Sequence, residues 1–502
     1  GPKRHPRVPK PGDLYPERRN SAGRDLSIRS EREALRRAAS ALPGKAHAGV
    51  EAAGPEQVER ALSAYAHWNA RGPQARAQIL NAMADALAAH ADDLVALIAR
   101  EAGRTLQDGI DEVREAVDFC RYYAAEAKRV MPARALPGPA GEDNTLELFG
   151  RGVFAAISPW NFPLSIFTGQ IAAALAAGNT VVAKPAEQTP RIAAEAVRLF
   201  YEAGLPGDVL RLAQGDGAVG AALVADRRIA GVVFTGSTET AQKINRSLAA
   251  RDGAIPVLIA ETGGLNAMFI DTTALKEQVV DDAILSAFGS AGQRCSSLRL
   301  LFLPHETADE IVEMLAGAMA ALVIGDPADP ATDIGPIIDA DAKAALDAHM
   351  ARMRAEANVI AQRDVAALGG NFFGPALVEL PDQALLRREV FGPILHIVRY
   401  DPAAIEAVGA ALAGAGYGLT LGVHSRLESF ARAVIAAVPA GNVYVNRSII
   451  GAVVGVQPFG GLGLSGTGPK AGGPHYLPRF ANERARAVNT AAQGGDPKLL
   501  NL

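Results

Sequence analysis

The chain has 502 residues, of which 49% are hydrophobic and 21% charged, and this is enough to bury two cores in a globular α/β protein. Its net charge of −4 excludes the strongly basic surface of a nucleic-acid-binding protein, and no apolar run reaches the ~18 residues that span a bilayer. Two cysteines cannot form a disulfide framework and nine histidines show no HExxH spacing, so we expect a reducing cytoplasmic setting, a small-molecule substrate and no zinc.

The first segment is rich in proline and charge. Residues 1–25 have the composition of a tether or of the end of a linker, and the basic residues at 3–7 lack the apolar segment of a signal peptide. From about residue 31 to 131, apolar residues recur three and four apart, which predicts helices. Cys120 lies in this pattern without a neighbouring base or glycine turn, so we expect it to pack in the core.

Strands follow the helical region. The sequence LPGPAG at 136–141 breaks the helices, and residues 145–149 alternate as a short strand. Short apolar strands then alternate with helices, which predicts a parallel, doubly wound sheet. We expect these strands at residues 153–157, 180–183, 209–213 and 231–234. The same alternation of strands and helices resumes with strands at 267–270 and 298–303, which predicts a second α/β domain. We expect the reaction to take place in a cleft between the two domains.

Two stretches match the dinucleotide pattern GxGxxG, at residues 215–220 and 461–466. The first follows a predicted strand and opens a predicted helix, so we expect Gly217 near a cofactor. The acidic residue that usually follows about twenty positions later at a strand end is missing there. The second match follows Pro458-Phe459-Gly460 and is interpreted as a backbone turn.

Three short segments carry groups suited to nucleophilic catalysis. Cys295 lies in the small-residue stretch FGSAGQRCSS, and a nucleophilic thiol needs a pKa lowered by a cation, backbone amides or a helix N-terminus. The preceding Arg294 receives no catalytic role, because its side chain can equally point away. Glu261 in ETGG and Asn161 in PWNFP add a base and an oxyanion donor. Taken singly, a free cysteine is more often a buried hydrophobe, and Glu261 can also cap a turn.

These segments resemble, in order, the motif set of the NAD(P)-dependent aldehyde dehydrogenases. The set also includes KPAE at 184–187, FTGS at 234–237, EVFGP at 389–393 and PFGG at 458–461, and it covers nearly the whole chain. Residues 19–26, 290–297 and 466–474 are similar to a narrower group, the L-glutamate γ-semialdehyde (pyrroline-5-carboxylate) dehydrogenases of bifunctional proline-catabolic enzymes. In those enzymes this part is joined to a proline dehydrogenase domain, which this chain does not include.

The resemblance implies the aldehyde dehydrogenase fold. It implies a Rossmann-like NAD-binding domain from residues 26–135 and 151–262, and an α/β catalytic domain from residues 263–465. A hairpin at 136–150 and the C-terminal segment 466–502 are expected to serve oligomerisation, with a homodimer as the assembly. The sequence of the tail after Arg484 is too featureless to predict its structure.

The resemblance also implies NAD as the cofactor. The pyrophosphate is expected near the helix that begins at Gly236 and Ser237, where free amides suit an anion. Glu187 would accept hydrogen bonds from the adenosine ribose and repel a 2′-phosphate, which favours NAD over NADP. The expected cofactor-binding residues are Ser158, Trp160, Lys184, Ala186, Glu187, Gly217, Phe234, Thr235, Gly236, Ser237, Gly263, Glu389 and Phe391.

The implied reaction oxidises L-glutamate γ-semialdehyde to glutamate. Attack by Cys295 gives a thiohemiacetal oxyanion stabilised by Asn161 and the backbone amide of Cys295; loss of hydride leaves a thioester, which Glu261 hydrolyses by activating water. The substrate carboxylate is expected at Ser296 and Gly451-Ala452, between apolar walls formed by Phe162 and Phe459. Two alternatives stay open: the same chemistry on another semialdehyde or an aliphatic aldehyde, and a non-catalytic NAD-binding scaffold.

Overall fold

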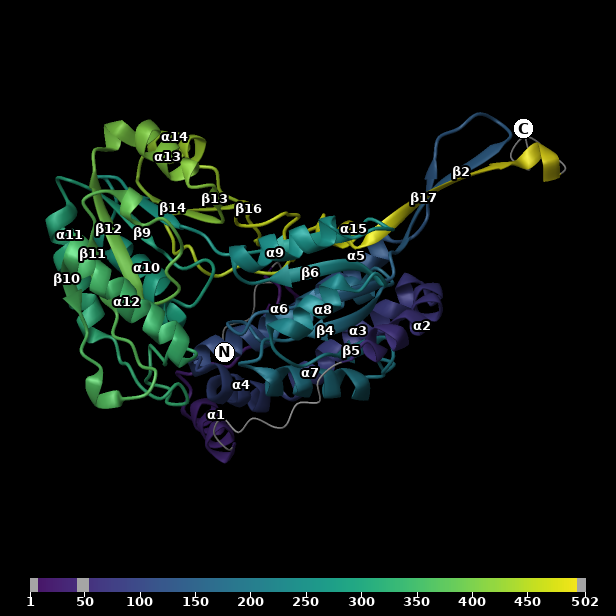
Figure 1. The fold of residues 1–502 in the computed structure, drawn as a ribbon, viewed down its shortest axis with the longest axis horizontal. Helices are drawn as coiled ribbons and strands as arrows, with labels where there is room; N and C mark the ends of the chain where they lie inside the picture. Colours follow the sequence, from purple (N-terminus) through teal and green to yellow (C-terminus); the bar gives the residue numbers. More distant parts are fainter. Residues whose placement is uncertain (1–7, 43–53, 494–502) are drawn as a thin grey trace.

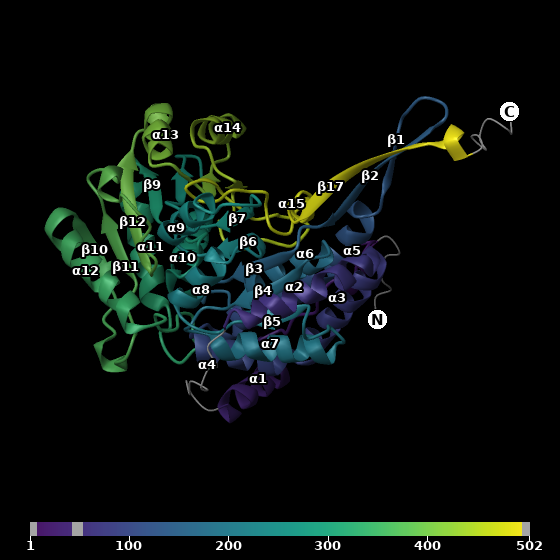
Figure 2. The same cartoon turned by 45° about the vertical axis from the view of Figure 1, so that its right-hand side comes forward.

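The computed structural model describes residues 8–42 and 54–493. Residues 1–7 of the expected tether and 494–502 of the expected C-terminal segment lie outside the described residues. Two bodies, each built on a large sheet, lie side by side, and a third, narrow sheet projects from one of them (Figures 1 and 2). Across the described ranges, no helix is both long and apolar enough to cross a bilayer.

Within the described residues, five α-helices precede the large sheets, as the apolar periodicity predicted. The longest, α5, begins after Thr105, whose side chain accepts a hydrogen bond from the backbone N–H of Asp108 and so caps the helix. Its buried face packs against α3 and α6. Cys120 lies on this face and is fully buried, which confirms its place in the core. The helices are α1 (Arg29–Ala41), α2 (Glu56–Ala70), α3 (Gly72–Ala89), α4 (Ala91–Ala102) and α5 (Leu106–Val130).

The first large sheet has five parallel strands in the order β5-β4-β3-β6-β7. The chain runs outward from the central β3 through β4 and β5, then crosses to β6 and β7 on the other side. The strand order therefore reverses beside β3, and doubly wound sheets bind ligands at such a reversal. The elements are β3 (Val153–Ile157), α6 (Ser165–Ala176), β4 (Thr180–Lys184), α7 (Pro190–Glu202), β5 (Leu210–Leu212), α8 (Gly217–Ala225), β6 (Ile229–Thr235), α9 (Thr238–Ala249) and β7 (Val257–Glu261).

The second large sheet has seven strands in the order β10-β11-β12-β9-β8-β14-β15, and only β10 is antiparallel to its neighbour. Its core includes Phe269 and Phe302, whose rings stack with centroids 4.4 Å apart. The elements are β8 (Ala267–Ile270), α10 (Lys276–Phe288), β9 (Leu300–Pro304), α11 (Ala308–Ala321), α12 (Ala340–Glu356), β10 (Asn358–Gln362), β11 (Ala376–Glu379), β12 (Ile394–Tyr400), α13 (Ile405–Gly414), β14 (Thr420–His424), α14 (Glu428–Ala437) and β15 (Asn442–Val445). A small pair, β13 (Tyr417–Gly418) and β16 (Leu462–Gly463), lies beside it.

The projecting sheet joins distant parts of the sequence. The expected hairpin is present as β1 (Arg134–Leu136) paired with β2 (Glu142–Gly150). The other edge of β2 pairs along its whole length with β17 (Ala481–Asn489), which follows the short α15 (Tyr476–Arg479). Part of the tail that looked featureless in the sequence is therefore a strand. The sequence did not reveal it because the strand that it pairs with lies more than 300 residues earlier. Its role in oligomerisation stays a prediction, as do the domain boundaries given above.

Candidate active site

The turn that carries Cys295 has an unusual backbone. Between α10 and β9, Ser290 and Ala291 both have φ of 56°, and Gly292 has φ of 64°. Left-handed conformations cost non-glycine residues of order 1–2 kcal/mol each, so surrounding contacts must hold this turn in place. Gly292 is required because an added Cβ would overlap the carbonyl of Gly392. The strained turn sets Cys295 at the edge of an internal cavity, where its side chain is half-buried.

A buried guanidinium supplies those contacts. Arg299 is fully buried and donates hydrogen bonds to the carbonyls of Gly292 and Arg294, at 2.8 and 3.0 Å. It also donates to the carbonyl of Gly392 at 3.1 Å and to the carboxylate of Glu389 at 3.2 Å. One side chain therefore ties the turn before Cys295 to the loop that contains Glu389. Sequence reasoning missed Arg299.

Asn161 lies beside the same turn, four residues after β3 ends. Its side-chain amide donates to the carbonyl of Gln293 at 3.1 Å, which uses one N–H and leaves the other for a ligand near Cys295. The backbone carbonyl of Asn161 accepts a hydrogen bond from Arg104, which also pairs with Glu112 at 3.4 Å. The role of Asn161 as an oxyanion donor stays a prediction.

A second asparagine fixes the other side of the nucleophile. Asn266 is buried, and its amide donates to the carbonyls of Cys295 and Ser297 at 2.6 and 2.9 Å. Its side-chain oxygen accepts from the backbone N–H of Thr420 at 3.1 Å. Its polar groups are thus satisfied by backbone, so Asn266 positions the Cys295 segment and does not face a substrate. It was not singled out from the sequence.

Glu261 ends β7 and points its carboxylate into a cradle of glycines. Its Oε2 accepts from the backbone N–H of Gly461 at 2.9 Å, whereas Oε1 is buried without a partner. Cβ atoms added at Gly460 or Gly466 would each lie 2.8 Å from one of its oxygens. The loop interpreted as a backbone turn therefore serves to admit this carboxylate. Burial raises the pKa of Glu261 to about 8, as expected for a base that works near neutral pH.

Glu389 is a second carboxyl group with a raised pKa. Burial raises its pKa to about 7, although the ion pair with Arg299 opposes the shift. Gly263 leaves the necessary space, because a Cβ at that position would overlap Oε2 of Glu389. Two residues on, Phe391 meets the ring of Trp160 edge-on at 5.6 Å, so the loop before β12 contacts the loop after β3 at this point.

The thiol itself departs from the sequence expectation. Burial raises the pKa of Cys295 to about 12, and the negative charges of Glu389 and Glu261 add to the shift, while Arg299 opposes it. The preceding Arg294 does not lower it, because its guanidinium points to Asp108 at 2.5 Å and to Ser290 at 2.7 Å. The expectation of a lowered pKa was therefore wrong for the ligand-free protein, and Arg294 has a structural role.

The cavity beside Cys295 brings together the residues predicted for the substrate. It has a volume of about 350 Å³ and is lined by Phe162, Ser296, Gly451, Ala452 and Phe459 together with Cys295 and Glu261. Gly451 has φ of 91°, a conformation that suits glycine. The opposite wall comes from α5, whose acidic face includes Asp111, Glu115 and Asp118. Sequence reasoning placed α5 in the core and missed this wall, although its acidic residues three and four apart were visible.

The predicted cofactor residues gather at one edge of the five-stranded sheet. Each follows the carboxyl end of a strand: Ser158 and Trp160 follow β3; Lys184, Ala186 and Glu187 lie at or after the end of β4; Gly217 begins α8 after β5; Phe234, Thr235, Gly236 and Ser237 run from β6 into α9; and Gly263 follows β7. Parallel strands place their carboxyl ends at one edge, so these residues lie together around the reversal of strand order. Glu389 and Phe391 reach this edge from the other body.

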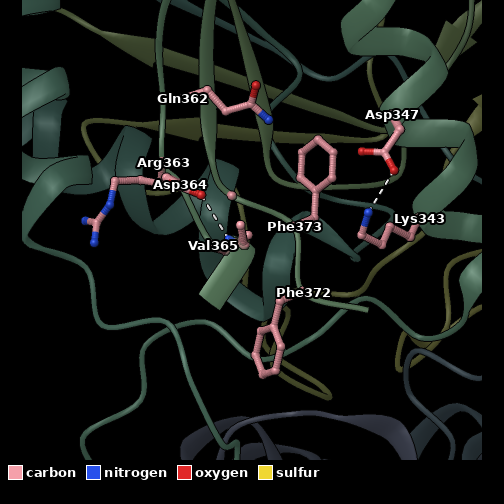
Figure 3. Close-up of a pocket in the computed structure, with 10 residues that line it drawn as sticks. Lys343, Asp347, Gln362, Arg363, Asp364, Val365, Phe372 and Phe373 are labelled. Carbon is pink, nitrogen blue, oxygen red and sulfur yellow. Dashed lines mark hydrogen bonds and ion pairs between the residues drawn. The ribbon is translucent and has the colours of Figure 1, made fainter. Parts of the chain in front are cut away.

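A separate pocket of about 350 Å³ lies between α12 and the segment that joins β10 to β11 (Figure 3). Its charged groups already have partners within the chain: Lys343 donates to Asp347 at 2.8 Å, and Asp364 accepts from the backbone N–H of Ala366 at 2.9 Å. None of the residues that line it was predicted to be functional. The pocket that contains Cys295 is therefore the candidate active site.

Comparisons with known proteins identify the family of the chain. A family model described as the aldehyde dehydrogenase family matches residues 29–485. The chain belongs to the aldehyde dehydrogenase family. The bifunctional protein PutA of Escherichia coli strain K12 is 47% identical over 97% of this chain, which spans 40% of that protein's length.

Two solved structures are also similar. A crystal structure of bifunctional proline utilization A matches with a TM-score of 0.95 and 55% identity, over 98% of this chain and 50% of that one. The 1-pyrroline-5-carboxylate dehydrogenase from Thermus, solved with bound NAD, matches with a TM-score of 0.88 and 30% identity, over 94% of this chain and 99% of that one. These similarities agree with both the broad and the narrow resemblance drawn from the sequence motifs.

The raised pKa of Cys295 can be measured by alkylation. With iodoacetamide and no cofactor, we expect the rate at Cys295 to rise about tenfold per pH unit from pH 7 to 10, because the thiolate fraction does so below the pKa. Glu389→Gln should raise the rate at pH 8 by about threefold or more, because it removes a negative charge near the thiol. Cys295→Ala reports the background from Cys120. A plateau reached below pH 8 in the parent protein would contradict this electrostatic description.

The space at Gly263 is a second test. Gly263→Ala should push the Glu389 carboxylate away from Arg299 and lower the free energy of unfolding by about 1–3 kcal/mol, as overpacking does. Gly207→Ala is the matched control, because a Cβ there meets nothing within 4 Å. Denaturant unfolding followed by circular dichroism gives both values, and equal stabilities for the two variants would show that Glu389 is not held against Gly263.

Proposed function

We propose that this chain catalyses the NAD-dependent oxidation of L-glutamate γ-semialdehyde, in equilibrium with pyrroline-5-carboxylate, to L-glutamate. The observation that carries the proposal is the cavity in which Cys295 and Glu261 share one space with Ser296 and the Gly451-Ala452 backbone. A thiol suits an aldehyde, and a hydroxyl together with a glycine turn suits a carboxylate. The names of the relatives, PutA and 1-pyrroline-5-carboxylate dehydrogenase, support the same substrate.

The residues at the sheet edge fit NAD. The hydroxyl of Ser158 is buried and has no hydrogen-bond partner among the residues that the structure describes, so it is available to a ligand. The N-terminus of α9, capped by Ser237, offers backbone amides to a pyrophosphate. Lys184 and Glu187 pair at 3.2 Å, and the half-exposed carboxylate of Glu187 suits ribose hydroxyls and disfavours a 2′-phosphate. We therefore propose NAD in preference to NADP, with Glu389 and Phe391 at the nicotinamide end.

Each of the three catalytic side chains has its own role in the proposed reaction. Cys295 must lose its proton before its sulfur attacks the aldehyde carbon, and the free N–H of Asn161 with the Cys295 backbone amide would stabilise the resulting oxyanion. When bound at the sheet edge, NAD would supply the acceptor for the hydride that leaves this carbon. The acyl group remains on Cys295 as a thioester, and Glu261 takes a proton from the water that hydrolyses it. A buried carboxyl group with a pKa of about 8 can both accept and return that proton near neutral pH.

We also propose that the protein is a homodimer. The sheet formed by β2 and β17 projects from the body and buries little of its own surface (Figures 1 and 2). The seven-stranded sheet ends at β15, an edge strand on which Val443 and Val445 are 36% and 41% exposed. Exposed apolar edge strands are usually covered by a partner.

By analogy with the bifunctional relatives, the full-length protein would add a proline dehydrogenase domain. The two free cysteines suit the reducing cytoplasm, which is the compartment that we propose.

A comparison of substrates tests the proposed reaction. NADH formation should be measured with pyrroline-5-carboxylate, succinate semialdehyde and propionaldehyde, each with NAD and with NADP. We expect kcat/KM to be at least about a hundredfold higher for pyrroline-5-carboxylate than for propionaldehyde, a difference of ~2.7 kcal/mol in transition-state stabilisation. Equal kcat/KM values for the three aldehydes would indicate an aldehyde dehydrogenase that acts on another substrate. Absence of NADH from every aldehyde would favour a non-catalytic scaffold.

The role of Glu261 is separable from that of Cys295. Glu261→Gln should preserve one rapid burst of NADH per active site and slow steady turnover by a factor of about 10²–10⁴, because only thioester hydrolysis needs the base. The rise in turnover around pH 8 should also disappear, since the group that titrates there is gone. Stopped-flow measurement gives both phases, with Cys295→Ala as the control that shows neither. Loss of the burst in Glu261→Gln would assign Glu261 to an earlier step.

A further inference from the structure

The N-terminal segment is attached to the wall of the active-site cavity. Residues 18–23 contact α5 at Arg114, Asp118 and Arg121. Within this segment Arg18 and Ser21 are buried, although they lie in a stretch of tether-like composition. Arg18 donates to the Asp118 carboxylate at 2.9 Å. Ser21 donates to the same carboxylate from its backbone N–H at 3.1 Å and from its hydroxyl at 2.7 Å. Asp118 itself lines the cavity.

Arg18 makes a second contact, with the loop that faces Cys295 across the cavity. Its other terminal nitrogen donates to the backbone carbonyl of Val454 at 2.7 Å. Val454 closes the run Gly451-Ala452-Val453-Val454, all of which lines the cavity. The guanidinium lies 3.9 Å from the centre of the Tyr15 ring, which covers its outer face. Arg18 does not itself line the cavity.

The geometry makes Arg18 a clamp between two walls of the cavity. One terminal nitrogen is fixed by Asp118 of α5 and the other holds the Gly451–Val454 loop, so the spacing between helix and loop depends on this side chain. Arg18 acts together with Gln457, whose backbone N–H donates to the carbonyl of Val453 at 2.8 Å and whose side-chain amide lies against the carbonyl of Gly451. Gly451 has φ of 91°, and an added Cβ there would meet open space. A tether alone would not require a buried arginine that bridges a carboxylate and a loop carbonyl.

We infer that Arg18 is a positioning residue for the substrate carboxylate. By holding the Gly451–Val454 loop, it keeps the backbone of Gly451 and Ala452 at the distance from Ser296 that a carboxylate on the far end of the substrate requires. This inference rests on the proposed function. It predicts that the N-terminal segment sets affinity for carboxylate-bearing aldehydes and leaves the chemistry at Cys295 unchanged.

Replacement of Arg18 tests the inference. Arg18→Met keeps the length of the side chain and removes both hydrogen bonds, and Arg18→Lys keeps the charge but cannot span both acceptors in the same way. The matched control is Arg19→Met, because Arg19 is the exposed neighbour and carries the same charge. For each protein, kcat and KM are measured with pyrroline-5-carboxylate and with propionaldehyde. Binding of L-glutamate without cofactor is measured by calorimetry.

We expect Arg18→Met to raise KM for pyrroline-5-carboxylate and Kd for L-glutamate about tenfold, with kcat within about twofold of the parent value, the size of effect that loss of a charged hydrogen bond produces. Kinetics with propionaldehyde should stay at the parent value. Arg18→Lys should be intermediate, and Arg19→Met should match the parent.

Three results would overturn the inference: unchanged L-glutamate affinity in Arg18→Met, an equal loss for both aldehydes, or the same loss in Arg19→Met. If Arg18→Met does not fold, Arg18→Lys decides by the same criteria. Failure of the proposed function is distinct, because it appears in the parent protein as the absence of a preference for pyrroline-5-carboxylate over propionaldehyde.

Discussion

The buried guanidinium of Arg299 is the contact on which the site depends. The turn before Cys295 contains three successive left-handed residues, a conformation that the sequence Ser-Ala-Gly would not adopt without support. Arg299 supports it by bonding two carbonyls of this turn, and with its remaining N–H groups it holds Gly392 and Glu389. The nucleophile and the Glu389 loop therefore cannot move independently. A lysine could not replace it, because an ammonium group lacks the planar fork needed to reach four acceptors.

The second organising constraint is electrostatic. Two carboxyl groups, Glu261 and Glu389, lie near a thiol in a buried setting, and burial raises the pKa of all three. Because like charges oppose one another at short range, the protons of this cluster are coupled and each ionisation makes the next less favourable. In the ligand-free protein the thiol is therefore protonated at neutral pH. The thiol must therefore lose this proton before its sulfur can act as a nucleophile.

The cavity also shows how the two bodies share one site. Cys295, Ser296 and the Gly451–Val454 loop come from the part of the chain around the seven-stranded sheet, whereas Glu261 and Phe162 come from the five-stranded sheet and α5 supplies the opposite wall. The N-terminal segment contacts this wall through the hydrogen bond that Arg18 donates to Asp118. A site assembled in this way has its reacting groups on rigid elements and its substrate end on a loop that other residues position.

The sequence by itself determined the elements and the reactive groups. Apolar periodicity located the helices and the parallel strands, because burial on one or both faces leaves a local pattern. Short motifs located Cys295, Glu261 and Asn161, because their chemistry needs particular side chains next to glycine or proline. The glycine turn at 215–220 was also recognisable, as a strand that leads into α8.

Only the tertiary structure decided how these pieces act on one another. The pairing of β2 with β17, the acidic wall from α5, the bonds made by Arg299 and Asn266, and the clamp of Arg18 all join residues that no local pattern relates. The direction of the Arg294 side chain, and with it the pKa of Cys295, was likewise open in the sequence. The physical reason is that a pKa depends on burial and on every charge within a few ångströms, and these are properties of the folded arrangement rather than of neighbouring residues in the chain.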